Sequence, residues 1–102
     1  MQLPQAFRSE AVVEIKDDGD ARLRVARMPA PEEGRVYQVW VLRKGETAPR
    51  PTDALFQPAE DGRATVDVPG GVEGVTAVLV TDEPDGGSPA PTREPSIVAP
   101  LA

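Results

Sequence analysis

The sequence predicts an all-β fold, an antiparallel β-sandwich of about six or seven short strands. Short apolar runs recur along the 102 residues, and turn-forming residues separate each run from the next. The 12 prolines and 9 glycines fall between these runs, which disfavours long helices. Residues 36–43 are apolar on both faces of an extended chain, so this stretch needs structure on both sides to cover it.

Residues 36–43 are expected to form the central strand of the sandwich. They include the single Trp and the single Tyr of the chain. We expect Trp40 to fill the core, because large aromatic side chains dominate core energetics. The alternative is that Trp40 and Tyr37 form an aromatic platform for a ligand, as in sugar-binding β modules.

The other strands follow from the alternation of apolar and polar residues. The first two are expected to form an antiparallel hairpin around a turn at residues 17–20. Residues 44–53 should form an irregular crossover, and residues 54–56 form either a brief strand or a plug over one end of the core. In chain order, the expected strands are residues 6–16, 21–25, 36–43, 54–56, 63–68, 75–81 and 96–99.

Residues 82–95 form a long predicted loop that is rich in Pro, Gly and Asp. Long loops without secondary structure are uncommon, and they are often functional or specially braced. In the structural interpretation, which we favour, Gly86 and Gly87 form a tight turn and the prolines stiffen the path across the end of the sandwich. In the functional interpretation, Ser88 and Thr92 present their hydroxyl groups to a ligand.

The composition excludes several classes of function. The chain has no cysteine and no histidine, so it lacks disulfides, thiolate metal ligands and the usual general base at neutral pH. Its 11 basic and 17 acidic residues give a net charge of −6, and no basic stripe is available for nucleic acid or anionic lipid. We expect no enzymatic activity, no cofactor, no metal, no nucleic-acid partner and no membrane contact from this domain itself.

The chain also shows no targeting or membrane-spanning signal. The longest apolar run, residues 75–80, is far shorter than the ~20 residues that a membrane helix needs. Residues 1–5 lack the basic region and the apolar core of a signal peptide. We expect residues 1–5 to be flexible and residues 1–102 to form a single domain.

Two groups of acidic residues are the remaining candidates for chemistry. The aspartates at residues 17–20 faintly resemble a calcium loop, but the distal Glu of that motif is absent, so a solvated hairpin turn is the preferred interpretation. Asp82, Glu83 and Asp85 are candidates for a pair of carboxylates that would act as acid and base in catalysis. Acidic residues beside Pro and Gly normally solubilise a loop, and this is the interpretation we favour.

Three segments carry a family pattern: a YQ-W strand at residues 36–42, a Gly-containing hairpin at residues 61–66, and an EP-GGS--PT loop within residues 80–92. Met28 and Pro29 fit the L-P segment that precedes the strand, with Met in place of Leu. The chain resembles the C-terminal domain of the anti-sigma-K factor family of actinobacteria and other bacteria. It departs from the pattern at Asp82 and Arg93. The motif residues, which the resemblance implies are mainly structural, are Tyr37, Gln38, Trp40, Glu83, Pro84, Gly86, Gly87, Ser88, Pro91 and Thr92.

The resemblance implies a place for this domain in a larger protein. Full-length members have a cytoplasmic N-terminal domain that holds an extracytoplasmic-function sigma factor off RNA polymerase, followed by one membrane helix. Signal-dependent proteolysis, first outside and then within the membrane, releases the sigma factor. The present chain is then expected to be the isolated outer domain, on the extracytoplasmic side of the bacterial cell membrane.

On this interpretation, the sigma factor is a partner only through the N-terminal domain, which this sequence does not contain. An outer-site protease or a signal ligand is the candidate partner for the outer domain. The alternative function is a stand-alone β-sandwich module that binds a polysaccharide or a peptide. Aromatic side chains exposed on one sheet face would favour that module.

Overall fold

The computed structural model describes residues 10–16, 19–70 and 72–101, and in these ranges it contains seven strands and no helix. Every strand pairing is antiparallel, which confirms the predicted all-β sandwich. Residues 1–5, expected to be flexible, lie outside the described ranges, as do two of the aspartates of the predicted turn. The strands are β1 (Glu10–Ile15), β2 (Ala21–Ala26), β3 (Arg35–Arg43), β4 (Arg50–Phe56), β5 (Ala64–Val68), β6 (Val75–Pro84) and β7 (Ile97–Pro100).

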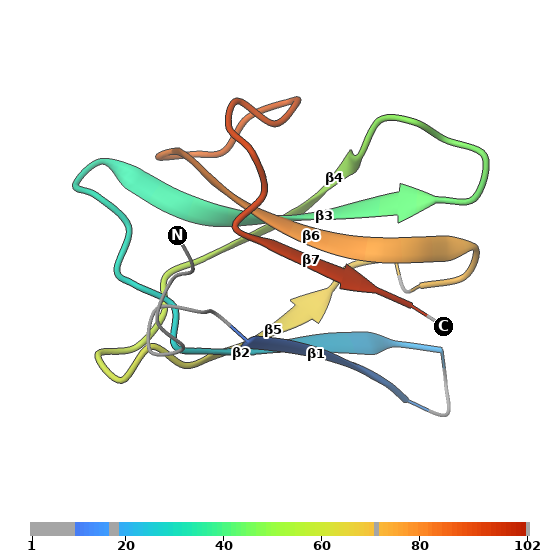
Figure 1. Cartoon of the computed structure of the whole chain (residues 1–102), viewed down its shortest axis with the longest axis horizontal. Coiled ribbons are helices and arrows are strands. Elements are labelled where there is room, and N and C mark those ends of the chain that lie inside the picture. Colours follow the sequence, from blue (N-terminus) through green and yellow to red (C-terminus); the bar gives the residue numbers. More distant parts are fainter. Residues whose placement is uncertain (1–9, 17–18, 71, 102) are drawn as a thin grey trace, which may run out of the picture.

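The strands form two sheets that pack face to face (Figure 1). The three-stranded sheet has the order β1-β2-β5, and the four-stranded sheet has the order β4-β3-β6-β7. The predicted hairpin is confirmed: β1 and β2 pair in continuous register from Glu10 opposite Ala26 to Ile15 opposite Ala21. Gly19 closes this hairpin with a φ of 88°, a conformation that glycine adopts without steric cost.

The main hydrophobic core fills the space between the two sheets. Leu23 of β2, Val39 of β3, and Val78 and Val80 of β6 are completely buried there. Fully burying one such aliphatic side chain contributes about 1.5–3 kcal/mol. The inward residues alternate with less buried ones along β2 and β5, as the sequence pattern predicts.

Strand β3 is buried on both faces, as its apolar pattern predicts. Tyr37, Val39 and Val41 belong to the main core, whereas Trp40 lies on the outer face of the four-stranded sheet. Trp40 is completely buried, but it packs in a second, smaller cluster with Ala77 and Leu79 and not in the space between the sheets. The prediction that Trp40 fills a core is therefore confirmed, and the structure adds that this core is the smaller cluster on the outer face.

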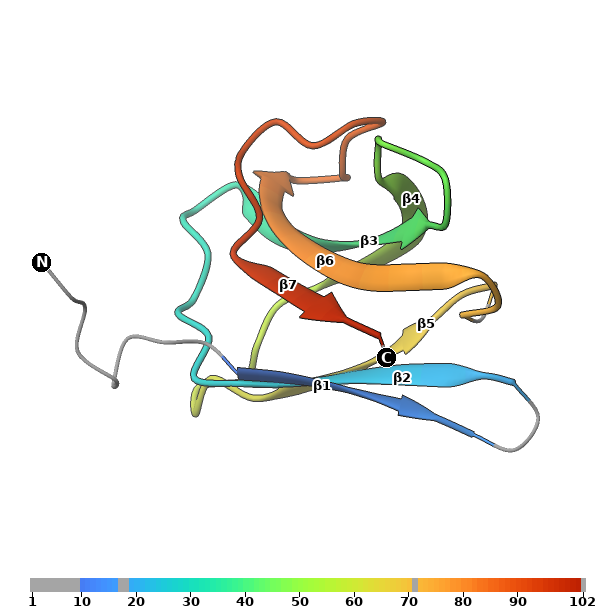
Figure 2. The same ribbon diagram turned by 45° about the vertical axis from the view of Figure 1, so that its right-hand side comes forward.

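The chain between β6 and β7 covers this outer face (Figure 2). We name residues 85–96 the motif loop, because they carry most of the EP-GGS--PT pattern. Figure 2 shows the motif loop arching over β3 and β6, on the side of the sheet opposite the main core. A second layer made of loop, and not of sheet, thus completes the burial of β3.

Strand β4 begins earlier than the sequence predicts, at Arg50 and not at residue 54. Pro51 and Asp53 interrupt the alternation there, which is why residues 44–53 look like an irregular crossover. An edge strand tolerates both irregularities, and β4 is the edge of its sheet. The pairing with β3 shifts register here, and the Thr52 hydroxyl donates to the Val39 carbonyl at 2.7 Å.

Strand β6 extends to Pro84, so Asp82, Glu83 and Pro84 belong to the strand and not to the predicted loop. The pairing with β3 continues to the end, with Glu83 opposite Val36 and Pro84 opposite Arg35. An ion pair between the Arg35 guanidinium and the Asp82 carboxylate holds this end of the two strands together. Both side chains are largely buried, at 18% and 19% exposure, so the pair is poorly screened by solvent.

Candidate functional site

Motif residues from β3, β6 and the motif loop meet on the outer face of the four-stranded sheet. Gln38 and Trp40 point outward from β3, and Glu83 points outward from β6. Ser88 and Thr92 come down to them from the motif loop. Residues that are far apart in the sequence therefore form one polar cluster beneath the loop.

The carboxylate of Glu83 is the centre of this cluster. The Thr81 hydroxyl donates to Glu83 Oε2 at 2.6 Å, and the Thr92 hydroxyl donates to Oε1 at 2.6 Å. The Thr92 backbone N–H lies 3.1 Å from Oε2 and 3.3 Å from Oε1. Trp40 Nε1 donates to the Thr81 hydroxyl at 2.7 Å, which extends the chain of hydrogen bonds to β3. We name Trp40, Thr81, Glu83 and Thr92 the Glu83 network.

The Glu83 side chain is completely buried and nevertheless ionised at neutral pH. Burial raises the pKa of Glu83, but hydrogen bonds from Thr81, Thr92 and Ser88 outweigh burial and hold the pKa below its ordinary value. A buried charge is costly unless donors surround it, and charge-assisted hydrogen bonds are about twice as strong as neutral ones. The three donors therefore have to stay in place while the charge is buried.

The three acidic residues considered for acid–base catalysis do not form a carboxylate pair. Successive residues of a strand point to opposite faces, so Asp82 and Glu83 lie on opposite sides of the sheet. Asp82 pairs with Arg35 and with Arg93, and Asp85 lies exposed in the turn that follows β6. The expectation that these residues merely solubilise a loop is also wrong for Asp82 and Glu83, because both are engaged by specific partners.

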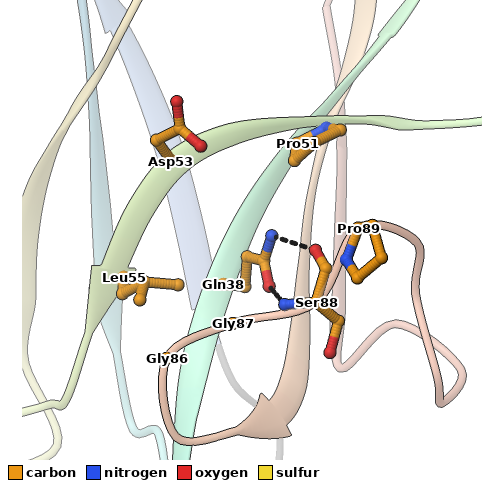
Figure 3. Close-up of a pocket in the computed structure, with 8 residues that line it drawn as sticks. All are labelled: Gln38, Pro51, Asp53, Leu55, Gly86, Gly87, Ser88 and Pro89. Carbon is orange, nitrogen blue, oxygen red and sulfur yellow. Dashed lines mark hydrogen bonds between the residues drawn. The ribbon is translucent and has the colours of Figure 1, made fainter.

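A second contact fixes the motif loop to β3 through main-chain atoms. The Gln38 side-chain amide donates to the Ser88 carbonyl at 3.0 Å, and the Ser88 N–H donates to Gln38 Oε1 at 2.8 Å (Figure 3). Gln38 is 3% exposed, so both hydrogen bonds are shielded from water. This closed pair of hydrogen bonds uses both ends of the amide, which a shorter or branched side chain at position 38 could not supply.

Gly87 allows the motif loop to approach β3 this closely. Its φ is 84°, and a Cβ built on it would lie 3.1 Å from Gln38 Oε1 and 3.2 Å from Leu55 Cδ2. Its N–H donates to the Pro84 carbonyl at 2.9 Å, which closes the turn after β6. A side chain at position 87 would thus strain the backbone and also collide with the Gln38 contact.

An open groove of about 360 Å³ lies beside this contact (Figure 3). Its walls are β4 on one side and the motif loop on the other. In the part of the chain that the structure describes, no group of His, Cys, Asp and Glu is arranged to hold a metal ion. The lining residues are Gln38, Pro51, Asp53, Leu55, Gly86, Gly87, Ser88 and Pro89.

The aromatic ligand platform is not present. Trp40 is completely buried, and Tyr37 is 4% exposed and stacks on Phe56 with ring centroids 5.5 Å apart. The Tyr37 hydroxyl donates to the Pro29 carbonyl at 2.7 Å. The functional interpretation of the loop, in which the Ser88 and Thr92 hydroxyls face a ligand, is not supported either, because both hydroxyls hydrogen-bond to the Glu83 carboxylate.

The remaining family segments lie on the other side of β3. Tyr37 holds Pro29, and the neighbouring Met28 N–H donates to the Gly62 carbonyl at 3.0 Å. A Cβ at Gly62 would lie 3.1 Å from the backbone N and O of Met28, so the Gly-containing hairpin packs directly on the L-P segment. The family segments identified in the sequence are therefore contiguous in space, with β3 between them.

Sequence reasoning missed Thr81, which connects Trp40 to Glu83. The available signal was the alternation of residues 75–81, because Thr81 is a polar residue on the same face as the apolar Ala77 and Leu79. A completely buried hydroxyl needs a hydrogen-bond partner, and Glu83 is the next residue on that face of β6.

Replacing Glu83 with Gln should destabilise the domain by about 1–3 kcal/mol, because the charge-assisted hydrogen bonds are lost and one donor faces the new NH₂ group. Urea unfolding monitored by Trp fluorescence measures this loss. Glu33→Gln is the matched control, since Glu33 is exposed and should change stability by no more than about 0.5 kcal/mol. Equal stability of the two variants would contradict the role given to the Glu83 network.

Gly87→Ala should cost more stability than Gly70→Ala. Gly70 has nearly the same φ, 82°, but an added Cβ would meet open space there, so its variant reports the backbone strain alone, about 1–2 kcal/mol. Gly87→Ala should lose about 1–3 kcal/mol more, because its Cβ also overpacks Gln38 and Leu55. Thermal unfolding of both variants measures this difference. Equal losses of stability would show that the motif loop shifts to accommodate the added Cβ, which would contradict a tight fit at Gly87.

The described part of the chain has no helix that is long and apolar enough to span a membrane. Comparisons with curated proteins and with solved structures found no significant match. A family model described as "Anti-sigma-K factor rskA, C-terminal" matches residues 2–97, which is nearly the whole chain and includes every residue of the Glu83 network. The chain therefore belongs to the anti-sigma-K factor family, as a C-terminal domain of that family.

Proposed function

We propose that this domain is the extracytoplasmic regulatory domain of a membrane-anchored anti-sigma factor, and that its folded state limits regulated proteolysis. The family implies a sigma factor as the partner of the full-length protein. In the family's domain order, the membrane helix precedes this domain, so the juxtamembrane segment lies N-terminal to the hairpin of β1 and β2. An outer-site protease would act on that segment.

The observation that carries the proposal is the attachment of the motif loop to the sheet at three points. Proteases cleave exposed and mobile segments, and long loops are their preferred targets. Here the motif loop is fixed at Ser88 by Gln38, at Thr92 by Glu83, and at Ser96 by the Val80 carbonyl. Cleavage within the domain then requires local unfolding, and its rate follows the population of the opened state.

The juxtamembrane segment is protected by the same cooperativity. The hairpin of β1 and β2 is attached to the rest of the domain through the main core, which includes residues of β3 and β6. Breaking the hydrogen bonds on the outer face of β3 and β6 destabilises these two strands, and the hairpin of β1 and β2 packs against them through the main core. A signal that opens the Glu83 network, such as a ligand that enters the groove beside Gln38, would increase access to the segment before β1.

The alternative, a stand-alone module for a polysaccharide or a peptide, has less physical support. Such modules present aromatic rings on one sheet face, whereas Trp40 and Tyr37 are buried and Phe56 is half-buried against Tyr37. Among the described residues, the exposed large apolar side chains are all aliphatic.

Outer-site cleavage of the full-length protein in its membrane tests the proposal. Glu83→Gln and the core variant Leu23→Ala should both increase cleavage without a signal, in the order of their loss of stability. Glu33→Gln should cleave like the unmodified protein. Cleavage that is unchanged in both destabilised variants would contradict a protective role for the folded domain.

A further inference from the structure

Strand β1 is an edge of the three-stranded sheet, and its backbone is regular enough to pair with another chain. Natural edge strands are protected from pairing by proline, by register shifts, by shortness or by charged side chains, and of these β1 has only the charges of Glu10 and Glu14. Among the other edge strands, β4 has Pro51 and a register shift, β5 has only 5 residues, and β7 has only 4 residues and ends at Pro100. Strand β1 has 6 residues in unbroken register with β2, and it contains no proline.

Among the described strands, only β2 pairs with β1, so the other edge of β1 presents its main-chain groups away from the sheet. The Lys16 N–H donates to the Asp20 carbonyl at 2.7 Å, so even-numbered residues of β1 direct their main-chain groups toward β2. The odd-numbered residues Ala11, Val13 and Ile15 then direct their N–H and C=O groups away from the sheet. A strand added at this edge would pair with these three residues.

The surroundings of this edge are apolar. Val12, Ile15 and Val98 are 61%, 59% and 57% exposed, and they are three of the four large apolar side chains that the described residues expose. A groove of about 470 Å³ is lined by residues of β1 and by residues of β7 and its C-terminal neighbour, and these two strands contact each other. The residues that line it all have apolar side chains: Ala11, Val12, Val13, Ile15, Val98, Ala99, Pro100 and Leu101.

We propose that a second copy of this chain occupies the edge, with the two β1 strands paired antiparallel about a two-fold axis at Val13. Directly opposed residues of an antiparallel pair share one face, so even-numbered residues must oppose even-numbered residues. In the proposed register Glu10 faces Lys16 of the partner subunit, and symmetry repeats this pair of opposite charges. The register shifted by two residues would instead oppose Glu10 to Glu14 of the partner subunit, a like-charge contact that is destabilising.

The same register uses the free main-chain groups fully. Val13 opposes Val13 of the partner subunit, and Ala11 opposes Ile15 of the partner subunit on each side of the axis. These are the residues with outward main-chain groups, and they would form about six hydrogen bonds between the chains. The inward side chains of the partner strand would also cover the apolar groove along β1. This pairing concerns the isolated chain and does not depend on the proposed function.

Cysteine cross-linking tests the register. The chain has no native cysteine, so any disulfide that forms must join the introduced cysteines. Glu10 and its opposed Lys16 form a non-hydrogen-bonded pair, whose Cα atoms lie about 4.5 Å apart, within the range that a disulfide spans. A mixture of Glu10→Cys chains and Lys16→Cys chains should give a covalent heterodimer on mild oxidation. Each variant alone should not cross-link. Cross-linking of either variant alone, or none in the mixture, would overturn the proposed pairing.

Sedimentation equilibrium tests the charge pairing. Glu10→Lys places two lysines opposite each other at both ends of the ladder, so the dimer Kd should rise about tenfold. The double variant with Lys16→Glu should restore the Kd, and thermal unfolding shows that each variant remains folded. A chain that stays monomeric up to millimolar concentration would overturn the proposal, because β1 would then not pair with a second copy of this chain.

Discussion

The structure depends most on one constraint, the burial of the ionised Glu83 carboxylate. A buried charge is tolerated only while hydrogen-bond donors surround it. Its donors come from β6 itself and from the motif loop, and Trp40 of β3 fixes the orientation of Thr81. The outer face of the sheet therefore closes as a unit, because the loop cannot leave without removing the Thr92 donors from the buried carboxylate.

Strand β3 transmits this constraint to the rest of the fold, because its successive residues point to opposite faces. On the inner face, Tyr37 holds Pro29 in the connection from β2. On the outer face, Gln38 holds the main chain of the motif loop, and Trp40 joins the Glu83 network. The family pattern is thus a description of contacts: each motif segment touches β3 or a residue that β3 holds. This explains how widely spaced residues identify one domain.

The sequence alone predicts the parts of the fold that follow from alternation, such as the first hairpin and the two-faced strand β3. The start of β4 is predicted wrongly, because Pro51 and Asp53 are residue types that are typical of loops. They are compatible with a strand here because β4 is an edge strand. The sequence pattern also ends β6 too early. Asp82 and Glu83 look like loop residues until Arg35 and the threonines are known to surround them. The motif residues were found by resemblance, but their hydrogen bonds depend on pairings distant in sequence, which no local pattern contains.

The central claim is that hydrogen bonds, and not an exposed surface position, keep Glu83 charged. A carboxyl whose pKa is lowered by folding contributes stability that is complete above its ordinary value of about 4.5 and is lost as the pH falls through the lower native value. The most direct test is an NMR titration of the Glu83 side-chain carboxyl in the folded domain, with the Thr92 amide followed in parallel. The account predicts a Glu83 pKa below the ordinary glutamate value and a Thr92 amide shift that titrates with it. A Glu83 pKa at or above the ordinary value, or a Thr92 amide that does not respond, would contradict it.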